Sequence, residues 1–155
     1  MLDAFALVTL ARDEPAAGEV EALLRRGDCV VTAVNLAEVL DQFGRVMGQS
    51  PERLETELSP LLGGALTVVS VDQRIAWRAA ELRRRHYASR ASELSLADCV
   101  ALAAVGPGDS LATADPPLAR AAQAEALEVI RLPDSRGRQP PDAAEAPEAA
   151  AAPED

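Results

Sequence analysis

The feature that most constrains the fold is a regular alternation of short β-branched runs with longer amphipathic segments. The runs predict strands at residues 29–32, 66–71, 110–113 and 127–132. Met1 and Leu2 are expected to form the short end of a further buried strand. The segments between the runs are long enough to cross over a sheet as helices, which favours parallel strands. We therefore expect an α/β fold, a three-layer α/β/α sandwich around a mostly parallel sheet.

The segments between the predicted strands have the apolar periodicity of helices. The expected helices are residues 4–11, 16–26, 33–47, 51–62, 72–86, 94–105 and 116–125. Some carry start signals, such as Ser50 before Pro51 and Asp72 before the long helix. In the helix over residues 33–47, one apolar face carries Leu36, Leu40, Phe43 and Met47, and the sequence does not decide whether it faces the core or a partner. His86 is expected to pack in the core, because it shares an apolar helix face with Leu82.

Length and composition indicate one domain with an acidic tail. The chain has 155 residues, and no apolar periodicity survives after Leu132. Residues 1–132 are expected to form the domain, and residues 133–155 a disordered tail rich in Pro, Ala, Glu and Asp. No signal-peptide pattern and no run of about 18 apolar residues occurs. Because Cys29 and Cys99 are expected to be buried thiols, we expect a soluble cytoplasmic protein without a membrane segment.

The net charge of −10 argues against nucleic-acid binding by bulk charge. Any such role must rest on metal ions or on a local basic patch. The densest basic run is residues 83–85, with Arg78 and Arg90 nearby. Its simplest interpretation is a solvated helix face, and contact with phosphate groups is the alternative.

A single carboxylate interrupts the apolar helix that begins near residue 94. The helical neighbours of Asp98 are Leu94, Ser95, Ala101 and Leu102. A buried carboxylate must be paired, hydrogen-bonded or bound to a metal ion. One interpretation is a capping box, in which Ser95 is the N-cap and Asp98 bonds back to its amide. The other is a functional acid, which depends on further carboxylates in the same place.

Three further acids are expected near this one, because sites in open parallel sheets form beyond the carboxyl ends of the strands. Asp3 follows the first strand, Glu38 lies in the helix after the second, and Asp115 follows the fourth. Each also has a purely structural interpretation. Asp3 and Asp115 are possible N-caps, and Glu38 belongs to a polar helix stripe that includes Asn35. Asp72 is a control, because it also follows a strand but would be remote if that strand lies at the sheet edge.

Four segments of the chain together carry a family resemblance. They are LDA at residues 2–4 with DEP at 13–15, TAVNLAEV at 32–39, LSLAD at 94–98 and LATAD at 111–115. In this order they resemble the PIN-domain family, specifically the VapC-type toxin ribonucleases of bacterial toxin–antitoxin pairs. The resemblance implies a sheet of strand order 3-2-1-4-5, with the first and fourth strands side by side. It implies an acidic cluster of Asp3, Glu38, Asp98 and Asp115, with a supporting hydroxyl from Thr113.

Clustered carboxylates repel one another, but they can stay ionised if hard cations lie between them. Oxygen ligands suit Mg²⁺ or Mn²⁺ rather than zinc, and no His or Cys cluster competes. A cation in such a site can activate water for in-line attack on phosphorus. We expect Asp3, with Asp98 or Asp115, to be the metal ligands, and Glu38 to act through a water or as a base.

The resemblance also implies a substrate and partners. RNA would be hydrolysed at its phosphodiester bonds, leaving a 5′-phosphate and a 3′-hydroxyl. A homodimer and a cognate antitoxin, a segment of which covers the active site, are implied as well. The helices over residues 33–47 and 51–62 have apolar faces that suit such contacts. The chain is thus expected to be a metal-dependent endoribonuclease, the toxin of a toxin–antitoxin pair.

Three other interpretations stay open. A phospho-accepting receiver domain would need a lysine near the last strand, and the chain has no lysine. A catalytically weak or inactive PIN-like domain would serve only in binding or interaction. Phe5 leaves room for this, because the family usually has a small polar residue there, and Cys99 stands where arginine is frequent. In the third interpretation, the acids only cap the helices of an α/β interaction protein.

Overall fold

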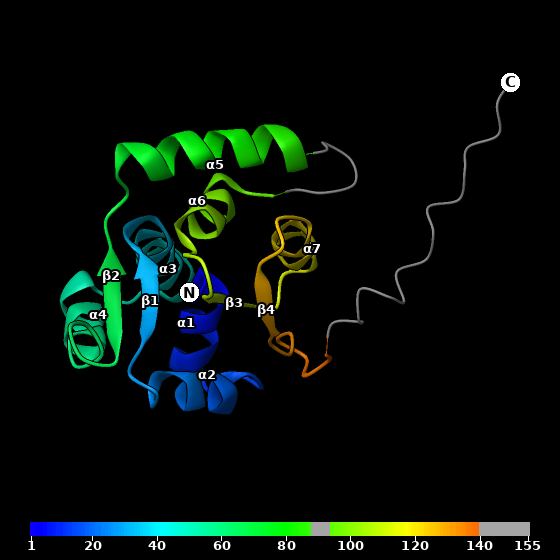
Figure 1. Ribbon diagram of the computed structural model, residues 1–155. Coiled ribbons are helices and arrows are strands. Elements are labelled where there is room, and N and C mark those ends of the chain that lie inside the picture. The colour runs from blue at the N-terminus through cyan, green and yellow to red at the C-terminus, as the bar shows by residue number, and fades with distance from the viewer. Residues whose placement is uncertain (88–93, 140–155) are drawn as a thin grey trace, which may run out of the picture.

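A central sheet of short parallel strands organises the fold. The computed structural model describes residues 1–87 and 94–139 (Figure 1). Its strands are β1 (Cys29–Thr32), β2 (Leu66–Val69), β3 (Ser110–Thr113) and β4 (Glu128–Arg131). β1 pairs in parallel with β2, and β3 pairs in parallel with β4. The predicted strands at residues 66–71 and 127–132 therefore exist but are shorter than expected.

Residues 1–3, which we call the N-terminal seam, join the two strand pairs. The amide of Leu2 donates to the carbonyl of Val30 at 2.8 Å, and Leu2 forms a parallel bridge with Ala112. The amide of Ala112 in turn donates to the carbonyl of Met1 at 2.9 Å. The order across the sheet is therefore β2, β1, the seam, β3 and β4. This confirms the predicted strand order 3-2-1-4-5.

The helices begin where the sequence supplies caps. They are α1 (Ala4–Ala11), α2 (Ala17–Leu24), α3 (Ala33–Met47), α4 (Pro51–Leu58), α5 (Gln73–His86), α6 (Leu96–Ala104) and α7 (Pro116–Ala124). The N-cap side chains that accept a hydrogen bond from a first-turn amide are Asp3, Thr32, Ser50, Asp72, Ser95 and Asp115. Because α1, α3 and α7 directly follow the seam, β1 and β3, their N-termini lie at the carboxyl edge of the sheet.

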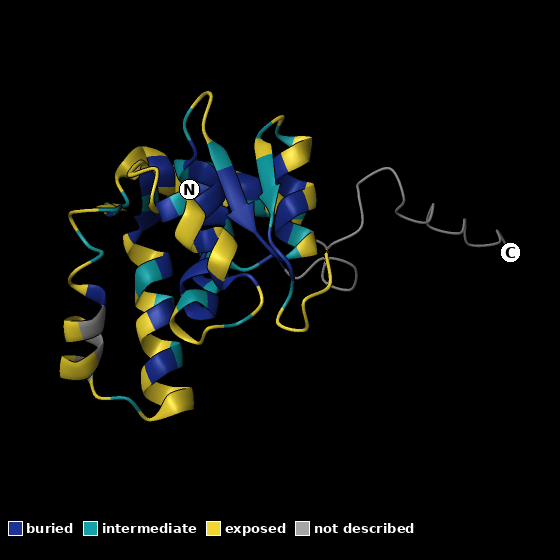
Figure 2. Cartoon of the chain, turned by 90° about the horizontal axis from the view of Figure 1, so that it is seen from below, coloured by how far each residue is buried: buried dark blue, intermediate teal, exposed yellow. Residues whose placement is uncertain are grey.

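Helices cover both faces of the sheet. One buried apolar cluster joins α1, α2 and α3 and includes Phe43, whereas the other joins α5, α6 and α7 and includes Leu82. Neighbouring residues of β3 point into different clusters, Leu111 into the second and Ala112 into the first, as strand geometry requires. Figure 2 shows a buried strand and one of intermediate burial beside helices with exposed outer faces. The predicted three-layer sandwich is confirmed.

The helix α3 buries only part of its predicted apolar face. Its buried residues are Asn35, Val39 and Phe43, whereas Leu40 and Met47 are 39% and 41% exposed. The helix packs against α1 and β1, and Leu40 lies on the side that faces α4. Because α4 is short and covers only part of that side, a groove is left between the two helices.

His86 and the segment after β4 also differ from expectation. Nε2 of half-buried His86 lies 2.7 Å from Oε1 of Glu125, just after α7, so His86 bridges two helices instead of packing in the core. After β4, Asp134 accepts hydrogen bonds from the amides of Arg136 and Arg138 and so closes a turn. Residues 140–155 of the predicted tail lie outside the described residues, and the domain division stays a prediction.

A membrane-spanning helix was not expected from the sequence. In residues 1–87 and 94–139, no helix is both long and apolar enough to cross a membrane. Both cysteines are buried and free, as expected from their segments.

Candidate functional site

Asp3 is a buried carboxylate at the end of the seam. Its side chain is the N-cap of α1, and Oδ1 accepts a hydrogen bond from the amide of Ala6 at 2.8 Å. The residue is 3% exposed. The pKa of Asp3 is raised to about 7, mainly by burial and also by the charges of Asp98 and Asp115, while the hydrogen bonds from Thr113 and Ala6 act to lower it. Two other acids are therefore within electrostatic reach of this buried carboxylate.

Thr113 and Asp115 end the neighbouring strand. The hydroxyl of fully buried Thr113 accepts the amide of Asp115 at 2.9 Å, and its side chain also hydrogen-bonds Asp3. Asp115 caps α7, with Oδ2 accepting the amide of Leu118 at 3.1 Å. Burial raises the pKa of Asp115, and the charge of Asp98 adds to this. Thr113 thus connects two of the predicted site acids, as its supporting role requires.

Asp98 is both a capping residue and the neighbour of all three other acids. The amide of Ser95 donates to Oδ2 of Asp98 at 2.8 Å, and the amide of Asp98 donates to Oγ of Ser95 at 3.0 Å, which confirms the capping box. The charge of Asp98 also raises the pKa values of Asp3, Glu38 and Asp115. The two interpretations of Asp98 are therefore compatible, because the cap holds its carboxylate toward the other acids.

Glu38 lies in the second turn of α3 and is partly buried. Burial raises the pKa of Glu38, followed by the charges of Asp98 and Asp41. Glu38 is therefore not simply a solvated residue of a polar stripe. Asn35, which was expected on that stripe, is fully buried one turn earlier.

Asp72 is a helix N-cap that also follows a strand but lies away from the acid cluster. Its Oδ1 accepts the amide of Ile75 at 2.7 Å at the start of α5, a geometry close to that of Asp3. Asp72 is exposed and follows β2, which is an edge strand. It is not among the charges that shift the pKa values of Asp3, Glu38 or Asp115. A cap at a strand end is therefore not enough to join the cluster.

Comparison with known families identifies the family of this chain. A model of the PIN domain matches residues 1–124. The chain belongs to the PIN domain family. PIN domains are generally nucleases that need a metal ion. The comparison with curated proteins gives no match.

The ligand chemistry of this PIN domain fits a divalent cation, although the carboxylates are not drawn together. Within the described ranges, no group of three or more His, Cys, Asp or Glu side chains is arranged to hold a metal ion. A backbone amide donates a hydrogen bond to one carboxylate oxygen of Asp3, of Asp98 and of Asp115. Carboxylate and hydroxyl oxygens are the ligands that Mg²⁺ and Mn²⁺ prefer.

A buried polar pair that was not predicted from the sequence lies at the start of α3, one turn before Glu38. Thr32 and Asn35 are both fully buried, and the hydroxyl of Thr32 donates to Oδ1 of Asn35. Nδ2 of Asn35 has no hydrogen-bond partner among the described residues. The available signal was an amide side chain one turn before Glu38, in a helix capped by a strand-end threonine. Phe5, by contrast, packs against the apolar cluster of α1, α2 and α3 and offers the site no polar atom.

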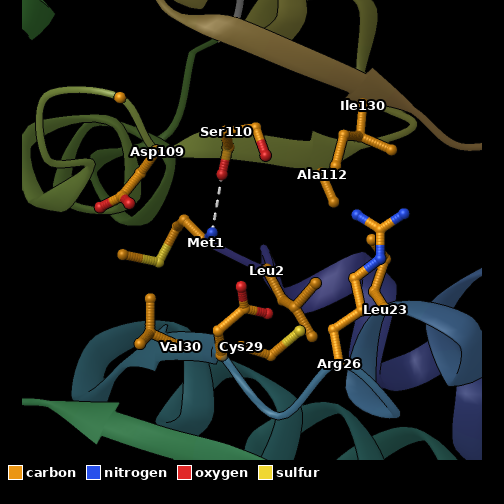
Figure 3. A pocket seen from close by; sticks show the side chains of 12 residues that line it. Met1, Leu2, Leu23, Arg26, Cys29, Val30, Asp109, Ser110, Ala112 and Ile130 are labelled. Carbon is orange, nitrogen blue, oxygen red and sulfur yellow. Dashed lines mark hydrogen bonds between the residues drawn. The ribbon is translucent and has the colours of Figure 1, made fainter.

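The opposite edge of the sheet carries a different hollow in this PIN domain. It has a volume of about 260 Å³, and Figure 3 shows Met1, Cys29, Asp109 and Ser110 around it. The amino group of Met1 donates to the carbonyl of Ser110 at 2.7 Å. The acids of this edge, Asp28 and Asp109, are exposed. They do not form a buried carboxylate cluster like that of the carboxyl edge.

Proposed function

We propose that this PIN domain is a metal-dependent endoribonuclease and the toxin of a toxin–antitoxin pair. The observation that carries the proposal is the mutual electrostatic influence of Asp3, Glu38, Asp98 and Asp115 at the carboxyl edge of the sheet. Like charges gathered around the buried carboxyl of Asp3 are costly unless a cation offsets them. Family membership and the acid cluster therefore support the same activity.

Asp3, with Asp98 or Asp115, would hold Mg²⁺ or Mn²⁺, and Glu38 would act through a water or as a base. A bound divalent cation lowers the pKa of a coordinated water and offsets charge on the scissile phosphate. Thr113 orients the Asp3 carboxylate through their hydrogen bond, and the Ser95 capping box orients Asp98. These contacts fix the directions of two proposed ligands.

The proposed reaction is hydrolysis of an RNA phosphodiester. The water oxygen bonds to phosphorus and the bond from phosphorus to O3′ breaks, which leaves a 5′-phosphate and, after protonation, a 3′-hydroxyl. Glu38 is the side chain available to accept a proton from the water, since the pKa of this carboxyl is raised toward the range of a useful base. No side chain becomes covalently attached to the substrate.

The toxin role requires an antitoxin, and the groove between α3 and α4 suits one. It has a volume of about 360 Å³ and is lined by Leu36, Leu40, Leu58 and Leu62, among others. An apolar segment of a small antitoxin would bury these side chains. A homodimer and a cytoplasmic location, where RNA is the available substrate, complete the proposal.

The decisive test is RNA cleavage by the full chain in Mg²⁺. We expect the wild type to cut single-stranded RNA, Asp98→Asn to lose cleavage, and Asp72→Asn to keep it. Asp72 is a matched control, because it caps a helix as well but lies outside the cluster. Cleavage by Asp98→Asn at the wild-type rate would contradict the proposal.

The alternative is a catalytically inactive PIN-like binding domain. It is favoured by one observation, namely that no three acids of the described chain are arranged to hold an ion. The same assay separates the two, because an inactive domain leaves RNA intact with every divalent cation tested while still binding its partner.

A further inference from the structure

Trp77 is the most exposed of the large apolar side chains in the described part of the chain. It is 72% exposed and lies on the side of α5 opposite the buried residues Ile75, Ala79 and Leu82. Single exposed apolar residues are common on protein surfaces, so exposure alone decides nothing. What distinguishes Trp77 is its surroundings, which are cationic rather than apolar.

The helix that carries Trp77 is basic in an otherwise acidic chain. α5 contains five of the fifteen arginines and a single glutamate, whereas the net charge of the chain is −10. Arg74 is three residues before Trp77 and Arg84 seven after it, so all three side chains share the outer face. Neither arginine has a carboxylate partner among the described residues.

The other arginines of the predicted basic run have structural partners. Arg85 pairs with Glu81 and Glu125. Arg83 lies over the ring of Tyr87, 4.8 Å from its centroid, and its Nη1 donates to the carbonyl of Leu94 at 3.1 Å. Residues 83–85 are therefore not one uniform solvated face, and Arg90 lies outside the described residues.

The basic end of α5 adjoins the proposed site. Leu94, which Arg83 contacts, directly precedes Ser95, whose capping box holds Asp98. Figure 1 shows α5 and α6 packed side by side. The C-terminal end of α5 therefore lies near the start of α6, which carries Asp98, and α5 runs for about 21 Å at 1.5 Å per residue.

We infer that Trp77, Arg74 and Arg84 form a binding face for the single-stranded RNA that flanks the scissile bond. An exposed indole stacks on any unpaired base, and unpaired guanidinium groups neutralise phosphates. A duplex would hide its base faces from Trp77, so the single-stranded form is the one that fits. This inference rests on the proposed ribonuclease function, because it assigns the path of that substrate.

A second copy of the chain fits this face less well than RNA does. A two-fold contact would place the same residues of both copies against one another. Arg74 and Arg84 would then meet identical unneutralised charges, which is unfavourable. RNA instead brings the opposite charge to the face.

Intrinsic fluorescence tests the inference directly, because Trp77 is the only tryptophan of the chain. The protein is the full-length Asp98→Asn variant, which should leave RNA uncut, and the probe is single-stranded RNA of mixed sequence. We expect RNA to quench the tryptophan emission and a matched duplex to quench it much less. Binding of single-stranded RNA without any change in emission would overturn the inference.

Affinity measurements in the same background give a second readout. Trp77→Ala should weaken binding about tenfold, the effect of one lost stacking contact. Arg84→Ala should lower the slope of binding against salt by about 0.7, the value for one phosphate contact on a single strand. Val46→Ala, a control at a 68% exposed position on α3, should change neither.

The two hypotheses fail in different ways. If the wild type cuts no RNA with Mg²⁺ but RNA quenches Trp77, the nuclease proposal fails and the binding face stands. If the wild type cuts RNA and Trp77→Ala does so with unchanged KM, the binding face is wrong. A wild-type dimer that Trp77→Ala converts to a monomer, with RNA affinity unchanged, would make this face a self-interface and also overturn the inference.

Discussion

The two edges of the sheet carry acids in very different surroundings. At the carboxyl edge Asp3 is 3% exposed and shares its electrostatic environment with Asp98 and Asp115. At the amino edge Asp28 and Asp109 are exposed beside a hollow. The parallel connections of the chain explain the contrast, because they place helix N-termini at one edge and helix C-termini at the other. Free amides at helix starts stabilise carboxylates, and free carbonyls at helix ends do not.

The contrast between the two edges predicts that cleavage needs Asp3 at the carboxyl edge and does not need Asp28 at the amino edge. Asp3→Asn keeps an oxygen for the Ala6 amide but loses the charge that a cation needs. We expect cleavage to fall at least about a hundredfold, the upper range for disturbing the surroundings of a metal ion. Asp28→Asn, at the exposed edge, should cut RNA at nearly the wild-type rate. Similar losses in both variants, measured on the same RNA, would remove the distinction between the edges.

The pH dependence of stability should also differ between variants at the two edges. Burial and neighbouring charges raise the pKa of Asp3 from its ordinary value of 3.8 to about 7 in the fold. From about pH 4 to 7, the unfolded chain has therefore lost this proton while the folded chain keeps it, so the free energy of unfolding falls as pH rises. Removing the group should abolish a loss of about 4 kcal/mol across that range.

Urea unfolding of wild type and Asp3→Asn in metal-free buffer at several pH values measures this loss. Asp28→Asn is the control for a change of net charge alone. If the free energy of unfolding depends on pH in the same way in wild type and in Asp3→Asn, then Asp3 is not a destabilising buried acid.

Divalent cations should stabilise the folded protein by binding at the carboxyl edge only. A ligand at a hundred times its dissociation constant adds about 2.7 kcal/mol to the free energy of unfolding. We expect Mg²⁺ or Mn²⁺ to raise the Tm of the wild type by several degrees and that of Asp98→Asn much less. Asp109→Asn, at the amino edge, should keep the full shift. An equal shift in all three proteins would mean that the cations act elsewhere.

The smallest expected effect concerns the cap that holds Asp98. Ser95→Ala should cost about 1 kcal/mol of stability, as for other N-caps. It should also slow cleavage severalfold, because the capping box that fixes Asp98 is lost. Ser50→Ala removes the equivalent cap of α4, away from the acids, and should lower stability alone. If both variants cleave RNA equally, the capping box has no role in positioning Asp98.

Local sequence signals predicted much of the fold. The caps at Ser50, Asp72 and Asp115 mark helix starts through residue types that bond to their own first turn. The β-branched runs marked the strands, although their ends were placed too far along the chain at residues 71 and 132. The order of strands came from the family resemblance, since no local signal encodes which strands pair.

What failed depends on neighbours that are distant in sequence. Asn35 was assigned to the polar stripe of α3, and an apolar stripe with Leu40 does not reveal whether it faces the sheet or another helix. In the structure Leu40 faces short α4, and Asn35 is buried with Thr32. His86 lies on the apolar face of α5, which predicted that it packs in the core. In the structure its ring instead contacts the carboxylate of Glu125. For the site, sequence placed the four acids, but only the fold separates them from Asp72.

The N-terminal seam has a consequence for the order in which the acid cluster can assemble during synthesis. Asp3 is made well before the residues that it meets, because the seam bonds to Ser110 and Ala112, more than a hundred residues later. Asp98 and Asp115 are made late as well, and domains complete their fold only once their distant segments have emerged. The acid cluster therefore cannot assemble on the ribosome until the chain has emerged as far as Asp115.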